Sequence, residues 1–364
     1  MLLALACVAL PAWANGANDN FKGVATLFGS GVTHYRRALY WATATTLAGS
    51  VAAVWLTAHL VAAFSGKLFV SADTLALTGF PLAVTGACAA TVLLATRIGA
   101  PISTTHALAG ALLGAAFAAP GSVVDWAKAG KQIFLPLAVG PLLAIAAAVL
   151  LYPLLSFARQ RLGITRNSCV CVGEQLTPQL DGTAVMRVSA SLGDAASCRS
   201  AYSGQVVGVP SQTLIDGLHY LSAGMVSFAR GVNDTPKIVA LVLMSAPRMQ
   251  GMGAFWAVGL TIALGGLLGA RRVAETMSTK ITAMNAGQGL SANLITATLV
   301  MAASPLGLPL STTHVSCGAL FGIGAVTRQA RWKTIAGIFA AWLITLPLAA
   351  SLGAGLMRLT LLIG

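Results

Sequence analysis

Charged residues are scarce in this sequence. Only 9% of its 364 residues are Asp, Glu, Lys or Arg, and only 7% are aromatic. A soluble chain carries roughly 25% charged residues, so a soluble globular protein of this length is excluded. Intrinsic disorder is excluded as well, because it requires low hydrophobicity, whereas 57% of these residues are hydrophobic and the mean hydropathy is +0.81. The composition therefore predicts a polytopic membrane protein, with room for about ten spans of about 20 residues.

Acidic residues are scarcer than basic ones. The chain has nine Asp and Glu against 22 Lys and Arg, which gives a net charge of +13. In a soluble protein this excess suggests nucleic-acid binding, but here the basic residues lie mostly in short gaps between apolar runs. We therefore expect a lipid bilayer, and no nucleic acid, as a partner. The sequence also lacks the Gly-x-x-x-x-Gly-Lys-Ser/Thr loop that binds ATP, which argues against a primary pump.

Cysteine is rare too, with six residues in the whole chain. Cys169, Cys171 and Cys198 lie in the one polar stretch of the sequence, and their spacing is only weak evidence for a metal site. We expect no cofactor, and no metal other than a coupling Na⁺.

Two motifs each occur twice, in the same order. Gly16–Lys22 (GANDNFK) recurs 215 residues later as Gly231–Lys237 (GVNDTPK), and Pro101–His106 (PISTTH) recurs 208 residues later as Pro309–His314 (PLSTTH). Two motifs repeated at nearly one spacing predict a duplicated half of about 150 residues.

The apolar segments divide the chain into a first membrane repeat (1–157), a polar insert (158–210) and a second membrane repeat (211–364). We expect an all-α fold with about five membrane units in each repeat and with interrupted helices. The Ser/Thr-headed units either cross the bilayer or form re-entrant hairpins. The expected units are 2–32, 38–64, 77–96, 101–118 and 132–157, then 212–246, 251–269, 288–304, 309–326 and 335–357.

An odd number of crossings in each repeat makes the second repeat inverted relative to the first. With this arrangement 14 Lys and Arg fall on one side of the membrane and five on the other. Because basic residues concentrate in cytoplasmic loops, we expect both termini outside and the insert in the cytoplasm. The protein is expected to lie in the cytoplasmic (inner) membrane.

Asp19 and Asp234 are carboxylates within apolar surroundings, and an intramembrane carboxylate points to a functional site. The Gly-x-Asn-Asp pattern favours turn-like backbone, which would free carbonyl groups beside the Asn18 and Asn233 amides. We therefore expect a site for a coupling cation at these four residues. The alternative is an Asn-Asp pair that only caps a helix.

Each Ser-Thr-Thr segment precedes a helix rich in small residues. A helix N-terminus has unpaired N–H groups and a partial positive charge, which bind anions. Three hydroxyls beside those amides suit a tetrahedral oxyanion, and the alternative is ordinary caps with small-residue packing. The expected anion-binding hydroxyls are Ser103, Thr104, Thr105, Ser311, Thr312 and Thr313, together with the Asn18 and Asn233 amides.

Five further ionisable residues accompany these motifs. His106 and His314 either carry coupled protons, since imidazole titrates near neutral pH, or pack across the repeat. Lys22, Lys237 and Arg230 either neutralise the two carboxylates or contact a bound anion directly.

Inverted repeats with paired polar motifs in interrupted segments are typical of secondary transporters that work by alternating access. An enzyme is not expected, because a hydrolase needs one asymmetric nucleophile and base, not two near-identical sets. A channel would not accumulate its anion against a gradient.

These motifs resemble those of the inorganic phosphate transporter (PiT) family, which includes phosphate permeases and some sulfate permeases. The resemblance extends from Asn15 to about Thr327. It implies a cation-coupled importer (a symporter) of inorganic phosphate, with the anion among the Asn-Asp and Ser-Thr-Thr motifs and the coupling ions beside Asp19 and Asp234. A homodimer is consistent with the same resemblance.

The first motif departs from the family pattern. The family commonly reads Asn-Asp-Val-Ala-Asn, whereas this chain has Lys22 at the last position. A fixed ammonium there stands where a coupling Na⁺ would sit, which favours proton coupling. Arg230 replaces a small residue or His of many relatives, and the added charge suits a more strongly ionised anion. Phosphate is the first expectation, and a proton-coupled sulfate permease is the alternative.

Overall fold

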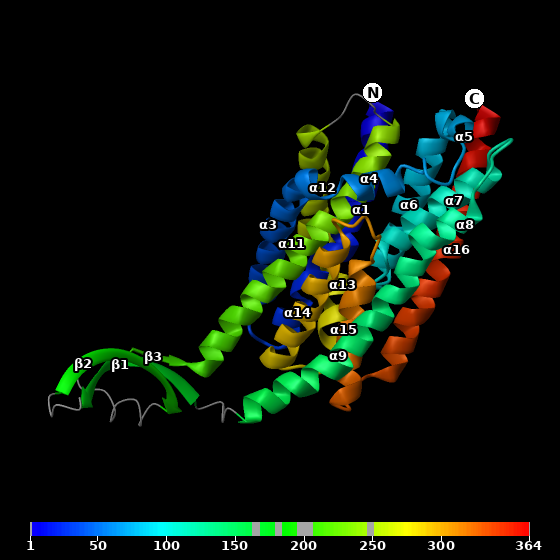
Figure 1. Cartoon of the computed structure of the whole chain (residues 1–364). Coiled ribbons are helices and arrows are strands. Elements are labelled where there is room, and N and C mark those ends of the chain that lie inside the picture. Colours follow the sequence, from blue (N-terminus) through cyan, green and yellow to red (C-terminus); the bar gives the residue numbers. More distant parts are fainter. Residues whose placement is uncertain (1, 162–167, 179–183, 195–206, 246–250, 364) are drawn as a thin grey trace.

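Long helices lie side by side in one bundle, and a small sheet lies beyond one end of it (Figure 1). The computed structural model describes residues 2–161, 168–178, 184–194, 207–245 and 251–363. Both termini lie at the end of the bundle opposite the sheet (Figure 1).

The helices of the two expected repeats follow the predicted units within a few residues. Those of the first repeat are α1 (Leu2–Asp19), η1 (Asn20–Val24), α2 (Ala25–Gly29), α3 (Tyr35–Leu56), α4 (Ala58–Phe64), α5 (Ala72–Ala76), α6 (Gly79–Arg97), α7 (Thr104–Ala118), α8 (Trp126–Ala129), η2 (Gly130–Phe134) and α9 (Leu135–Arg161). Those of the second are α11 (Ser211–Ser245), α12 (Met252–Gly269), α13 (Arg271–Glu275), η3 (Thr276–Lys280), α14 (Ala286–Ala303), α15 (Thr312–Val326) and α16 (Trp332–Ile363).

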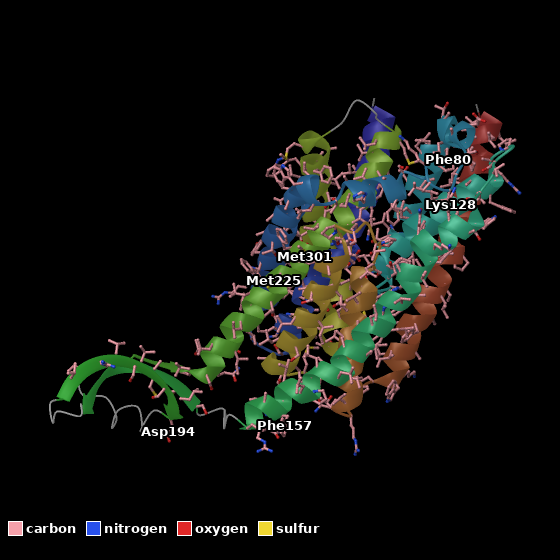
Figure 2. The ribbon with its side chains drawn as sticks, in the orientation of Figure 1. Phe80, Lys128, Phe157, Asp194, Met225 and Met301 are labelled. Atoms are coloured by element: carbon pink, nitrogen blue, oxygen red, sulfur yellow. The ribbon has the colours of Figure 1, made fainter. Side chains whose placement is uncertain are left out.

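Among the described residues, five helical segments are long and apolar enough to cross a membrane: α3, α6, Trp126–Arg161, α12 and α16. Their outward side chains are mostly carbon (Figure 2), and Leu343 and Leu150 are 77% and 74% exposed. Large apolar groups on the outside of a bundle are suited to lipid and not to water. The chain is therefore a multi-pass membrane protein.

The expectation of an all-α chain is wrong in the insert. Strands β1 (Ser168–Pro178), β2 (Ala184–Asp194) and β3 (Val207–Pro210) form an antiparallel sheet in the order β2-β1-β3. Val170 and Val172 alternate along β1, and β-branched residues of this kind favour extended backbone. The spacing of Cys169, Cys171 and Cys198, which was only weak evidence for a metal site, cannot be compared, because Cys198 lies outside the described residues.

The two Asn-Asp motifs differ in backbone. The first is interrupted as expected, because α1 ends at Asp19 and a tighter 3₁₀ turn follows. The second is not, because α11 continues through it and past Pro236. Proline removes one helical hydrogen bond, but α11 continues as a helix and packs on α3 and α14. The expectation of freed carbonyls at the second motif is therefore wrong.

Helix contacts recur between corresponding elements of the two expected repeats. The α1–α12 contact matches the α11–α3 contact, and α7–α16 matches α15–α9. The first pair depends on glycine, since a Cβ on Gly16 would lie 2.0 Å from the Ile262 carbonyl oxygen, and one on Gly231 would lie 2.2 Å from that of Thr46. Small residues of this kind allow two membrane helices to approach closely.

Gly231→Ala is expected to destabilise the protein by about 1–3 kcal/mol, the usual cost of overpacking a filled core. The reason is that the neighbouring atom is backbone of α3, which cannot turn aside as a side chain can. Thermal unfolding in detergent should show the lower midpoint. Gly217→Ala on the same helix is the control, because no atom lies within 4 Å of its Cβ position. Equal midpoints for the two variants would contradict this packing.

Two helix hairpins meet inside the bundle. The flanks of α6–α7 are joined by a bridge between Val70 and Val124, and those of α14–α15 by a bridge between Thr282 and Ala330. Each hairpin therefore returns to the end at which it starts. The α6–α7 hairpin opens toward the termini and the α14–α15 hairpin toward the sheet (Figure 1). The turns of both hairpins carry the Ser-Thr-Thr motifs.

Candidate functional site

Every buried Asp, Glu, Lys or Arg side chain among the described residues lies in one of the two Asn-Asp motifs or, for Arg230, directly before the second. Asp19, Lys22, Arg230, Asp234 and Lys237 are each at most 4% exposed. Charges are costly away from water unless they are paired. With all five ionised, three cations face two carboxylates, and the core keeps one positive charge. That remainder favours an anion.

The first Ser of each Ser-Thr-Thr motif caps its helix, as the sequence predicts. The Ser103 hydroxyl accepts a hydrogen bond of 3.1 Å from the His106 N–H, and the Ser311 hydroxyl accepts one of 3.2 Å from the His314 N–H. The threonines then occupy the first turns of α7 and α15. All four of these threonines are buried: Thr104, Thr105, Thr312 and Thr313.

Four oxygens surround the Lys22 ammonium. It donates to Asn18 Oδ1 at 2.8 Å, to the Ile102 carbonyl at 2.7 Å and to Thr313 Oγ1 at 2.7 Å. It also forms an ion pair with Asp19 Oδ1. Thr313 belongs to the second expected repeat, so Lys22 joins the first Asn-Asp motif to the turns of both hairpins.

Lys237 makes the corresponding contacts in the second motif. Its ammonium donates to Thr105 Oγ1 at 2.8 Å and to the Leu310 carbonyl at 3.1 Å, and it lies 3.4 Å from Asp234 Oδ1. Thr105 comes from the first repeat. Lys22 therefore bonds to a threonine of the second expected repeat, and Lys237 bonds to a threonine of the first.

The first motif asparagine holds a hairpin turn in place. The Asn18 amide donates to Thr96 Oγ1 at 2.9 Å and to the Ala100 carbonyl at 3.1 Å, while its oxygen accepts from the Ile102 N–H at 3.3 Å. Through these bonds the Asn18 amide positions the backbone of the α6–α7 turn, and its oxygen also accepts from Lys22.

The second motif asparagine does the same at the other hairpin. The Asn233 amide donates to the Leu310 carbonyl at 2.9 Å and to Asp234 Oδ1 at 3.1 Å. Its oxygen accepts from Ser304 Oγ at 3.3 Å. Both asparagines thus fix the turns that carry the hydroxyls.

Arg230 occupies the sequence position before the second motif that Asn15 occupies before the first, and the two side chains contact each other. The guanidinium donates to Asn15 Oδ1, Asn20 Oδ1 and Thr46 Oγ1, each at 3.2 Å, and lies 3.9 Å from Asp234. Sequence reasoning missed Asn15 and Asn20. The repeat alignment could have indicated Asn15, because it directly precedes the glycine of the first motif as Arg230 precedes that of the second.

Asn15 links the two carboxylates. Its amide donates to Asp19 Oδ2 at 2.9 Å, to Thr104 Oγ1 at 3.2 Å and to Asp234 Oδ2 at 3.4 Å, and Thr104 also donates to Asp19 Oδ2 at 2.8 Å. A cavity of about 10 Å³ lies between Asn15, Thr104, Asp234 and Lys237. It has room for about one water molecule, so an oxyanion requires the hairpin turns to move apart.

The two motif histidines pack against each other behind the threonines. Their ring centroids are 4.5 Å apart, and the His314 ring lies 3.9 Å from the indole of Trp342. The Trp342 N–H donates to the Pro101 carbonyl at 3.1 Å. This geometry fits the packing alternative for His106 and His314, and Trp342 is a member that no motif indicated.

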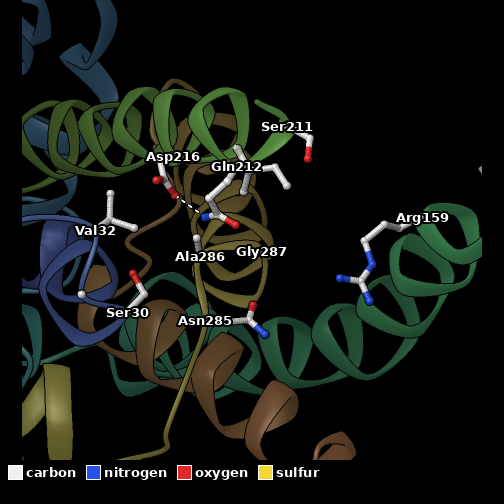
Figure 3. Close-up of a pocket in the computed structure, with 11 residues that line it drawn as sticks. Ser30, Val32, Arg159, Ser211, Gln212, Asp216, Asn285, Ala286 and Gly287 are labelled. Carbon is white, nitrogen blue, oxygen red and sulfur yellow. Dashed lines mark hydrogen bonds between the residues drawn. The ribbon is translucent and has the colours of Figure 1, made fainter. Parts of the chain in front are cut away.

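A larger pocket of about 460 Å³ opens at the end of the bundle nearest the sheet. Arg159 on α9 faces it from the side opposite Gln212 and Asp216 on α11, and those two are joined by a hydrogen bond of 2.7 Å (Figure 3). Its other lining residues are Ser30, Gly31, Val32, Ser211, Ile215, Asn285, Ala286 and Gly287.

A buried polar layer lies farther along α11, between this pocket and the charged centre. Thr26 Oγ1 lies 3.0 Å from His219 Nε2 and donates to Asn293 Oδ1 at 3.0 Å, and the Asn293 amide reaches Ser222 Oγ at 3.3 Å. The described residues contain no group of three or more His, Cys, Asp and Glu that could hold a metal ion.

Comparisons with known proteins show which family the chain is similar to. The model of the phosphate transporter family (PHO4) matches residues 15–353. A putative phosphate permease of Thermococcus kodakarensis is 26% identical over 97% of this chain and 96% of its own length. A probable low-affinity inorganic phosphate transporter of Rhizobium meliloti is 37% identical over 38% of this chain and 44% of its own length.

The fold is that of a solved sodium-dependent phosphate transporter. The two chains superpose with a TM-score of 0.78 and 22% identity, over 100% of this chain and 99% of the other. With the family match over residues 15–353, this chain belongs to the phosphate transporter (PHO4) family, the PiT family that its paired motifs resemble, whose members are transporters and not enzymes.

Proposed function

We propose that this protein transports inorganic phosphate across the cytoplasmic membrane as a cation-coupled symporter, by alternating access around the charged centre. The observation that carries the proposal is the set of five buried charges beside the hairpin turns, in which three cations face two carboxylates. An anion that enters this centre meets an excess positive charge and hydroxyl donors from both repeats. The roles expected for the Asn-Asp and Ser-Thr-Thr residues are part of this proposal.

The carboxylates favour phosphate over sulfate. Phosphate near neutral pH keeps at least one O–H, which can donate to a carboxylate, whereas sulfate has no proton to donate. A carboxylate that faced sulfate would leave two acceptors opposed, and an opposed buried pair is costly. Asp19 and Asp234 both lie within hydrogen-bond reach of Asn15 beside the central cavity. Arg230 remains the feature that supports the alternative, a proton-coupled sulfate permease.

Inverted repeats would allow the two hairpins to act alternately. The opposite openings of α6–α7 and α14–α15 support such inversion (Figure 1). The termini lie at one end of the bundle and the insert at the other (Figure 1). The distribution of basic residues supports the insert end as the cytoplasmic one. In this orientation the 460 Å³ pocket is the cytoplasmic vestibule, and the layer at Thr26, His219 and Asn293 closes it from the centre.

Uptake by proteoliposomes tests the proposal. Labelled phosphate should accumulate above its external concentration when an inward cation gradient is imposed, because a symporter couples the two movements. Labelled sulfate, measured in parallel, should accumulate less, because it cannot donate to the carboxylates. Empty liposomes are the control. Failure of both anions to accumulate under proton and sodium gradients would contradict symport, and preferred sulfate uptake would select the alternative.

A further inference from the structure

Each lysine of the two Asn-Asp motifs holds its ammonium inside a group of oxygens drawn from both repeats. We infer that Lys22 and Lys237 are tethered cations that fill the two positions a coupling Na⁺ would take, so that this chain transports its anion without sodium. The inference rests on the proposed function for its transport readout, and on the geometry alone for its binding readout.

The oxygens around Lys22 form a set that a hard cation would use. We call Asn18 Oδ1, Asp19 Oδ1, the Ile102 carbonyl and Thr313 Oγ1 the Lys22 cage. A carboxylate, an amide oxygen, a backbone carbonyl and a hydroxyl are the ligand types that bind hard cations in proteins. The ammonium supplies the single positive charge at the centre of this set.

The oxygens around Lys237 repeat the arrangement. The Lys237 cage consists of Asp234 Oδ1, the Leu310 carbonyl and Thr105 Oγ1. Each cage contains a motif carboxylate, a carbonyl from one hairpin turn and a threonine from the other repeat. A chance contact of a long side chain would not be expected to recur with the same three groups at both motifs.

The ammonium groups are committed to the cages and not to an anion. An ammonium has three N–H donors and no acceptor. Lys22 faces four oxygens and Lys237 faces three, so neither keeps a donor for a ligand in this arrangement. A direct anion contact would require these bonds to be broken first.

A tethered cation changes the energetics of transport. Sodium that enters with the anion and leaves on the other side transfers the energy of its gradient, whereas an ammonium on the chain stays with the protein. The cages therefore contribute the charge and the cross-repeat contacts of a bound Na⁺, but no coupling to sodium. Accumulation of the anion must then be driven by a coupling cation other than sodium, and we propose the proton.

The first test measures wild-type phosphate uptake in proteoliposomes with Na⁺ replaced by K⁺ or choline at constant ionic strength, under a fixed proton gradient. Rates should agree within about twofold. A rise of about tenfold or more (one decade) in the wild-type uptake rate on adding Na⁺ would overturn the inference, whatever the variants show.

The second test removes the tethered charge. Lys22→Asn and Lys237→Asn should each open a cage to the ion, so that NaCl raises their Tm in detergent by about 5 °C over choline chloride, as expected for a ligand at roughly 100 times its Kd. Wild type and Lys128→Ala, which lacks an exposed ion pair with Asp125, should show equal Tm in both salts.

The outcomes separate the two proposals. Sodium-specific stabilisation of the variants supports the cages even if no preparation transports phosphate, in which case the proposed function alone fails. Equal Tm values in NaCl and choline chloride for folded Lys22→Asn and Lys237→Asn would overturn the inference. If neither variant folds, the wild-type sodium test decides it.

Discussion

Asp19→Asn is expected to reduce phosphate uptake by at least about 100-fold, the effect of roughly 2.7 kcal/mol. The carboxylate forms an ion pair with Lys22 through Oδ1 and accepts hydrogen bonds from Thr104 and Asn15 through Oδ2. An amide of the same size turns one acceptor into a donor and leaves the buried ammonium uncompensated. Breaking one partner of a buried pair costs about 3–5 kcal/mol.

Initial rates of labelled phosphate uptake check this result, with the amount of reconstituted protein measured in the same vesicles. Asp125→Asn is the matched control, because that carboxylate is exposed and pairs with Lys128 at 3.0 Å outside the centre. Uptake of Asp125→Asn should equal that of wild type. Wild-type uptake by a folded Asp19→Asn variant would remove the carboxylate from the mechanism.

Asp234→Asn should cause a smaller loss than Asp19→Asn. Its carboxylate lies 3.4 Å from Lys237 and 3.9 Å from Arg230, which are longer contacts than that between Asp19 and Lys22. The same uptake measurement ranks the two variants. The reverse order would mean that the second motif, and not the first, is the tighter electrostatic centre.

The sequence alone predicted much of this centre because its residues occur twice. The Asn-Asp and Ser-Thr-Thr motifs recur in the same order, so their members could be named before their neighbours were known. The helix starts at Thr104 and Thr312 were predictable too, because a Ser directly before a helix satisfies one of its unpaired N–H groups. Length and hydropathy predicted the membrane spans for the same local reasons.

Other parts depend on neighbours that are distant in the sequence. Asn20 lies at a position of the first motif whose residue type the second motif does not share, and Trp342 lies outside both repeated motifs. Both belong to the centre through contacts that include the bonds to Arg230 and to the Pro101 carbonyl. The unbroken course of α11 past Pro236 depends on packing against α3 and α14, which overrides the local turn preference. Local residue types give no information on such contacts.

Arg230→Met is expected to lower phosphate uptake by about 100-fold, mainly through a higher KM. The substitution removes the excess positive charge of the centre and leaves the oxygens of Asn15, Asn20 and Thr46 without their shared donor. Arg230 also keeps its Nε atom without a hydrogen-bond partner among the described residues. That donor is available to an anion once the hairpin turns separate.

Arg230→Lys distinguishes charge from geometry. An ammonium restores the positive charge but not the planar fork that reaches Asn15, Asn20 and Thr46 together. If charge attracts the anion, Arg230→Lys should keep a KM within about tenfold of wild type, one decade of affinity, while its Tm falls. Arg271→Met is the control, since Arg271 is exposed and pairs with Glu275 away from the charged centre. A wild-type KM in Arg230→Met would show that the guanidinium acts only as a tie between helices, and the excess charge would then have no part in binding.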